Sequence, residues 1–154
     1  MGTLTMEEFA CGAEALVDYC RKFNARTTKV VDMQLVSTEK PYLSAAPVYL
    51  KLGEQIDIAY SLTFQVPVPY FCGQTTTRTL YNIDSNAMLS VAEHPITGLP
   101  CLFFHPCQSA TVMAELGAGR DPLEYILKWL GAYNHLLGLG IPNDFFTSPS
   151  QTSL

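Results

Sequence analysis

The residues of this sequence best suited to covalent chemistry are a His-Pro-Cys element at positions 105–107. It follows the apolar run 102–104 and precedes residues 108–116, whose pattern predicts a helix ended by Gly117. A cysteine at the start of a helix lies beside unpaired backbone amides and the positive end of the helix dipole, which stabilise a thiolate. The thiolate is the nucleophilic form, so Cys107 is the candidate reactive residue. The alternative is an ordinary half-buried cysteine that packs as a small apolar side chain.

The sequence has five cysteines, an odd number with no closely spaced pair. A chain of 154 residues folds without covalent cross-links, so this usage favours reduced thiols in the cytosol, and no disulfide is expected. The two cysteines of the first predicted helix are interpreted as structural. Four residues could be grouped as zinc ligands: His94, Cys101, His105 and Cys107. Because the usual closely spaced pairs of zinc ligands are missing, no metal or cofactor is expected.

The composition predicts one soluble domain over residues 1–146, followed by a disordered polar tail over residues 147–154. Hydrophobic residues make up 48% and charged residues 15% of the chain. The net charge of −5, without clusters of lysine and arginine, argues against binding to nucleic acid or to anionic membranes. No segment reads as a membrane span or a signal peptide, which favours a cytoplasmic location.

Capping signals and hydrophobic periodicity predict the elements that position the His-Pro-Cys element. Helices are predicted over residues 6–23, 83–91, 108–116 and 121–138, and strands over residues 29–37, 48–52, 56–66 and 101–104. Prolines at 67 and 69 are expected to interrupt the ladder, so residues 70–72 are expected to pair only at a sheet edge. A helix, a run of antiparallel strands and then further helices is the order of an α+β domain, with helices packed on one face of the sheet.

Several segments, taken together, resemble the autophagy E2-like conjugating enzymes. They are Tyr60-Ser61, Phe64–Val68, Tyr70-Phe71, His94-Pro95-Ile96 with Gly98 and Pro100, His105-Pro106-Cys107, Ile126–Leu130, Gly138-Leu139 and Ile141-Pro142. The resemblance is strong over residues 56–146 and weak before them. It implies an E2-like fold, with an antiparallel β-meander, an N-terminal helix and C-terminal helices.

The resemblance also implies an activity and a set of partners. An E1-like activating enzyme would pass a ubiquitin-like modifier to Cys107 as a thioester, and the modifier would then move to a lysine of an autophagy scaffold protein. A relative acting on phosphatidylethanolamine and a non-catalytic E2-like binding module are the alternatives. A cysteine protease would also need a histidine with an orienting Asn or Asp, and nothing else in the sequence supports peptide cleavage.

Residues around Cys107 have less certain roles. Ile96 stands where ordinary E2 enzymes have an asparagine that is thought to stabilise the oxyanion or the active-site loop, and isoleucine donates no hydrogen bond. His105 is one candidate for oxyanion stabilisation or proton transfer, and the amides of Gln108 and Ser109 are another. A purely structural role for His105 is equally compatible with the sequence. The base that deprotonates the incoming lysine could be His105, Glu93 or Asp84.

Other site assignments depend on the predicted elements. Tyr60 is a core tyrosine by its place in the strand pattern, and the resemblance puts it near the catalytic cysteine. Val66, Val68 and Tyr70 are predicted to shape a sheet edge on which a partner protein docks by strand addition. Cys101 is the rival nucleophile, but it begins an apolar run, where burial blocks access to a thiol.

Overall fold

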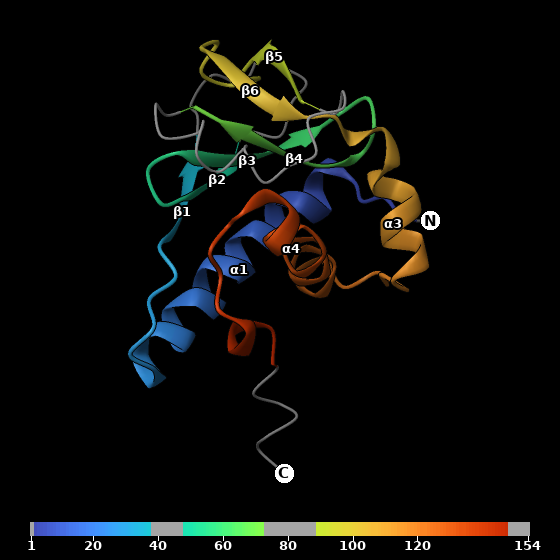
Figure 1. The fold of residues 1–154 in the computed structure, drawn as a ribbon. Coiled ribbons are helices and arrows are strands. Elements are labelled where there is room, and N and C mark those ends of the chain that lie inside the picture. Colours follow the sequence, from blue (N-terminus) through green and yellow to red (C-terminus); the bar gives the residue numbers. More distant parts are fainter. Residues whose placement is uncertain (1, 38–47, 73–88, 148–154) are drawn as a thin grey trace.

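A computed structural model describes residues 2–37, 48–72 and 89–147 (Figure 1). Its described part is an antiparallel six-stranded sheet with helices α1 (Met6–Arg26) and α4 (Pro122–Leu137) on one face. The shorter helix α3 (Ser109–Glu115) lies at one end of the sheet, and two 3-10 turns, η1 (Pro106–Gln108) and η2 (Asn143–Phe146), complete the described elements. This is the predicted α+β arrangement of the E2-like fold.

The sheet has the order β1-β2-β3-β4-β6-β5, and every neighbouring pair is antiparallel. The strands are β1 (Met33–Ser37), β2 (Val48–Leu52), β3 (Ile56–Ser61), β4 (Val66–Phe71), β5 (Leu89–Glu93) and β6 (Pro100–Phe104). The first four strands form a meander. The last two form a hairpin whose second strand, β6, pairs with the end of β4 and leads directly into η1 and α3.

Helix α1 begins at the predicted capping box. The Thr5 side chain accepts a hydrogen bond from the Glu8 amide at 3.1 Å, and the Glu8 carboxylate accepts one from the Thr5 amide at 2.8 Å. These two contacts satisfy amides that the first turn of a helix leaves without partners. The buried stripe of α1 includes Phe9, Leu16 and Phe23. This stripe faces α4 and the first strands, so α1 closes one side of the core.

Helices α1 and α4 cross at close range because α1 has a glycine at the crossing point. A Cβ atom on Gly12 would lie 2.8 Å from the Pro122 carbonyl oxygen and 2.7 Å from the Ile126 side chain. Helix α4 runs from Pro122 to Leu137, between Asp121 and Gly138 as predicted, although the Asp121 side chain makes no capping hydrogen bond. Its inner face buries Trp129 and Leu130 completely, and such large side chains dominate the stability of a core.

The strand predicted over residues 56–66 is too long. Strand β3 ends at Ser61, residues 62–65 form a turn, and β4 starts at Val66. Leu62 and Phe64 continue the alternating pattern but are 50% and 38% exposed, because they lie in the turn. A period-two pattern does not separate a strand from an apolar turn that follows it.

Two further element predictions are wrong. Residues 66–71 form a continuous strand, and Tyr70 and Phe71 pair with strands on both sides, so neither the interruption at the prolines nor the edge position predicted for residues 70–72 is observed. Pro67 and Pro69 fit because β6 pairs only with Tyr70 and Phe71 and needs no amide from the prolines. Residues 89–91, predicted as the end of a helix, belong to strand β5, while residues 83–88 lie outside the described part, as do residues 148–154 of the predicted tail.

Candidate active site

Cys107 lies in the turn between β6 and α3. It is the middle residue of η1, and its side chain is exposed and not in a disulfide. The strand β6 holds one end of this turn, and α3 begins two residues after the cysteine. The predicted position before a helix is therefore confirmed. Cys107 is presented to solvent on a short connection that is anchored at both ends, which a protein-sized reaction partner requires.

The imidazole of His105 caps the turn that contains Cys107. Its Nδ1 atom accepts a hydrogen bond from the Cys107 amide at 3.1 Å, so in the neutral ring the proton is on Nε2. The ring packs edge-on against Phe64, with 5.4 Å between ring centres, and lies 6.0 Å from the Phe103 ring. These contacts support the structural alternative for His105, and the oxyanion or proton-transfer role remains a prediction.

A buried pair of hydroxyl groups anchors the start of α3 to α4. The Ser109 Oγ and Tyr133 hydroxyl oxygens lie 3.0 Å apart, and both side chains are buried. Burial is the main cause of the raised pKa of Tyr133, and the hydrogen bond with Ser109 partly lowers that pKa. The Ser109 amide donates to the Pro106 carbonyl, so it is engaged within the turn. Sequence reasoning did not single out Tyr133 for this role, because nothing local signals a contact 24 residues distant.

Tyr60 lies in the core. It is 5% exposed, its ring packs against Phe9, and its hydroxyl donates to the Leu4 carbonyl at 2.7 Å. Burial is the first cause of its raised pKa, so the hydroxyl stays protonated. The core position and the hydroxyl partner expected from the sequence are both found. Its predicted nearness to the catalytic cysteine remains a prediction.

The residues predicted to form a partner-docking edge belong to β4, of which only the second half is paired on both sides. Val66 and Val68 are buried, and Tyr70 pairs with Phe103 of β6 and is partly exposed. Tyr70 is not at an edge, because β3 and β6 pair with it on its two sides, whereas Val66 and Val68 pair with β3 and the register with β6 does not reach them. A docking role for this segment stays a prediction. It could involve the backbone of the first half of β4, but not the two buried valine side chains.

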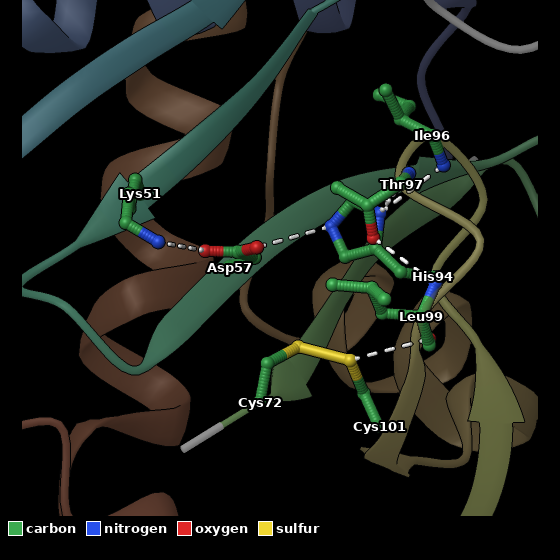
Figure 2. The surroundings of a disulfide bond; sticks show 8 residues. All are labelled: Lys51, Asp57, Cys72, His94, Ile96, Thr97, Leu99 and Cys101. Atoms are coloured by element: carbon green, nitrogen blue, oxygen red, sulfur yellow. Dashed lines mark hydrogen bonds and ion pairs between the residues drawn. A yellow bond between two sulfur atoms is a disulfide. The ribbon is translucent and has the colours of Figure 1, made fainter.

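A buried contact between a histidine and an aspartate holds the loop between β5 and β6 (Figure 2). His94 is 1% exposed and Asp57 is 4% exposed, and Nε2 of His94 lies 3.2 Å from Oδ2 of Asp57. Nε2 makes no hydrogen bond, so the contact is electrostatic, and it is an ion pair only when the imidazole is protonated. Lys51 approaches the other carboxylate oxygen at 3.4 Å. Sequence reasoning missed this set, because Asp57 reads as an exposed residue of an alternating strand.

The same histidine shapes the His-Pro-Ile segment. Nδ1 of His94 accepts hydrogen bonds from the amides of Ile96 at 3.1 Å and Thr97 at 3.2 Å. Because Nδ1 accepts, the neutral ring has its proton on Nε2, which faces Asp57. Ile96 is thus held by its backbone, and its aliphatic side chain offers no donor for an oxyanion.

The expectation that the chain forms no disulfide is wrong in this structure. Cys72 and Cys101 form one, with 4.8 Å between their Cα atoms (Figure 2). Phe71 of β4 pairs with Leu102 of β6. Cys72 follows Phe71 and Cys101 precedes Leu102, so the two cysteines lie opposite each other. Their separation of 29 residues hides this proximity in the sequence. Cys101 has no free thiol here, and the cytosolic location loses the support that it drew from reduced thiols.

Thiol labelling should distinguish the cysteines. Cys11 and Cys107 are exposed, whereas Cys20 is buried and burial raises the pKa of its thiol to about 12. We therefore expect two thiols of the native protein to react rapidly with a maleimide at neutral pH, and Cys20 to react only on unfolding. Peptide mass spectrometry would identify them. Rapid labelling of Cys20 in the folded protein would contradict the described core.

Three of the four residues considered as zinc ligands have other partners. His94 contacts Asp57, Cys101 is in the disulfide, and His105 binds the Cys107 amide. Residues 2–37, 48–72 and 89–147 contain no group of three or more His, Cys, Asp or Glu side chains suited to hold a metal ion. Among those residues, no helix is both long and apolar enough to cross a membrane. Of the candidate bases, Glu93 ends β5 and Asp84 lies outside the described residues.

An N-terminal helix on an antiparallel sheet, C-terminal helices, and an exposed cysteine between the last strand and α3 define an E2-like domain. Residues 36–144 match the family described as "Autophagocytosis associated protein, active-site domain", and the chain belongs to this family. The resemblance expected from the sequence segments is thereby confirmed. The matched range contains Cys107 and excludes Cys11, the other exposed free thiol.

Two similar proteins are each named ubiquitin-like-conjugating enzyme ATG10. The protein of Dictyostelium discoideum is 29% identical over 120 residues, which cover 58% of this chain and 52% of the relative. That of Gibberella zeae is 34% identical over 79 residues, which cover 51% of this chain and 30% of the relative. The chain thus spans about half or less of the length of the curated relatives that it matches, and resembles the ATG10 enzymes among the autophagy E2-like proteins.

Proposed function

We propose that this protein is an E2-like conjugating enzyme of autophagy that holds a ubiquitin-like modifier as a thioester on Cys107. The observation that carries the proposal is the placement of Cys107. Of the cysteines in the matched active-site domain, all of which lie in the described residues, it alone is both free and exposed. The ubiquitin-like-conjugating enzymes that the chain resembles support the same reaction class.

The proposed reaction has two acyl transfers. In the first, the Cys107 thiolate attacks the thioester carbonyl of the modifier held by an E1-like enzyme, and the bond to the E1 cysteine breaks, releasing that cysteine as a thiolate. In the second, a lysine amine of an autophagy scaffold protein attacks the Cys107 thioester. An isopeptide bond forms, the Cys107 thiolate leaves, and the amine proton passes to a base. Neither transfer needs a metal or a cofactor.

The role of His105 can be tested with two variants. His105→Ala removes the acceptor for the Cys107 amide, whereas His105→Asn keeps an oxygen acceptor near the position of Nδ1 but cannot transfer a proton at neutral pH. If the cap is what matters, transfer should fall about tenfold in the alanine variant and return to within about threefold of wild type in the asparagine variant. Single-turnover discharge of the thioester to lysine measures both. Equal, large losses in the two variants would instead support proton transfer or oxyanion stabilisation.

A reconstituted charging assay tests the proposal. The protein is incubated with the E1-like enzyme, ATP and the modifier, and then run on a non-reducing gel. We expect a band shift that a thiol reductant removes and that Cys107→Ala abolishes, while Cys11→Ser leaves it unchanged. The charged enzyme is then offered scaffold protein or phosphatidylethanolamine vesicles. Transfer to the protein supports the proposed acceptor, transfer to lipid supports the alternative, and a lack of charging would leave only a binding module.

A further inference from the structure

We propose that the segment Gly2–Leu4, here called the strap, is a positioning element for the turn that contains Cys107. This inference rests on the proposed function, because it concerns how the reactive thiol is presented. The strap precedes α1, far from Cys107 in the sequence. In the fold it lies beside α3, as the N-terminal end of the ribbon shows (Figure 1).

The first end of the strap packs directly on the backbone of α3. A Cβ atom on Gly2 would lie 2.0 Å from the Ala110 carbonyl oxygen and 3.0 Å from the Ala114 amide nitrogen. Gly2 also has φ +80°, which favours glycine. Ala110 follows Cys107 by three residues. Any side chain at position 2 would therefore push the helix that carries the end of the reactive turn.

The other end of the strap is bound to the turn between β3 and β4, which contacts His105 just before Cys107. The Leu4 amide donates to the Gln65 carbonyl at 2.9 Å, in the turn between β3 and β4. The neighbouring residue of that turn, Phe64, packs edge-on against the ring of His105. His105 in turn accepts the hydrogen bond of the Cys107 amide. The strap thus connects to the reactive turn from both sides through short chains of contacts.

Two buried tyrosine hydroxyls fix the strap from the core. Tyr125 of α4 donates to the Gly2 carbonyl, and Tyr60 of β3 donates to the Leu4 carbonyl at 2.7 Å. Burial is the first cause of the raised pKa of both tyrosines, so each hydroxyl remains a donor at neutral pH. Both carbonyls lie in buried residues, where loss of the donor leaves an oxygen unsatisfied. The strap is therefore held in one place relative to α4 and the sheet.

A conservative pair of variants separates positioning from stability. Tyr125→Phe removes the hydroxyl that binds the strap, and Tyr19→Phe removes a hydroxyl that donates to the Phe145 carbonyl, away from the strap. Both lose one hydrogen bond from a tyrosine to a backbone carbonyl. We expect Tyr125→Phe to slow single-turnover charging of Cys107 about fivefold at saturating charged E1, with the half-saturating concentration unchanged, and Tyr19→Phe to stay within about twofold of wild type.

A second pair tests the close approach of Gly2 to α3. Gly2→Ala places a methyl group against Ala110, whereas Gly53→Ala has a similar positive φ of +62° and nothing within 4 Å. Both variants strain the backbone, and only the first displaces a neighbour. We expect charging to slow more than about tenfold for Gly2→Ala and less than about twofold for Gly53→Ala. Hydrogen exchange of the uncharged protein should be faster in α3 for Gly2→Ala alone, with the β1–β3 amides unchanged.

The outcomes distinguish this inference from the proposed function. If wild type is charged on Cys107 but Tyr125→Phe and Gly2→Ala match their controls, the strap has no positioning role and the proposed function stands. If wild type is not charged, the proposed function fails, and hydrogen exchange then decides the inference. Faster exchange confined to α3 in Gly2→Ala supports it, and exchange equal to that of Gly53→Ala overturns it.

Discussion

Replacing Cys107 with serine is expected to reduce transfer of the modifier by at least about 10³-fold. Serine has a hydroxyl group of high pKa in place of the thiol, so it attacks the E1 thioester slowly. Any ester that does form is less reactive toward an amine than a thioester. The variant should therefore accumulate a small amount of adduct that resists thiol reductant, which a gel run with and without reductant would show.

Cys11 provides the matched control for this prediction. It is the other exposed free cysteine among the described residues, and it lies on α1 outside the matched active-site domain. Cys11→Ser should charge and transfer at the wild-type rate. If Cys107→Ser kept its rate while Cys11→Ser lost it, the site would be on α1 and the assignment made here would be wrong.

Replacing His94 with alanine is expected to lower the free energy of unfolding by about 3 kcal/mol. The change leaves the buried Asp57 carboxylate with Lys51 as its remaining charged partner. It also removes the acceptor for the amides of Ile96 and Thr97. The imidazole ring, whose centre lies 4.8 Å from that of Tyr49 and 5.2 Å from that of Tyr70, is lost as well. For a domain of this size, such a loss lowers the melting temperature by roughly 10 °C.

Two further variants show whether this loss comes from the buried contact. His135→Ala changes an exposed histidine in the last turn of α4 and should cost less than about 1 kcal/mol. Asp57→Asn keeps an oxygen acceptor but removes the charge, and should lie between the two. Chemical denaturation of the three proteins measures the order. A His94→Ala variant as stable as His135→Ala would show that the contact with Asp57 contributes nothing.

Helices α1, α3 and α4 and the reactive turn could be predicted because their signals are local. Thr5 and Glu8 form the capping box that starts α1, and Pro122 and Gly138 bound α4. The His-Pro-Cys element lies in the turn before a helix, as its flanking residues indicated. Each of these features depends on residues within four positions of one another, so an isolated sequence contains the required information.

The sheet was less predictable because pairing depends on residues far apart. Leu62 and Phe64 continue an alternating pattern, yet they lie in a turn that contains no glycine or proline to mark it. Pro67 and Pro69 argued for an interrupted edge, but the short pairing with β6 leaves their missing amide protons without consequence.

The parts of the site that sequence reasoning missed are all tertiary. The disulfide between Cys72 and Cys101 and the contact between Asp57 and His94 depend on how neighbouring strands align. The bond between Ser109 and Tyr133 depends on how α4 packs beside α3. The position before a predicted helix and the family resemblance both indicated Cys107, but the contacts that hold it became visible only in the fold.

The most direct test of the central claim is to locate the modifier on the charged wild-type protein. After reaction with the E1-like enzyme, ATP and the modifier, free thiols are blocked at low pH, the thioester is released, and the newly exposed cysteine is labelled and identified by peptide mass spectrometry. We predict a label on Cys107. A label on Cys11 or Cys20 in place of Cys107 would contradict the claim that the turn between β6 and α3 is the site of thioester formation.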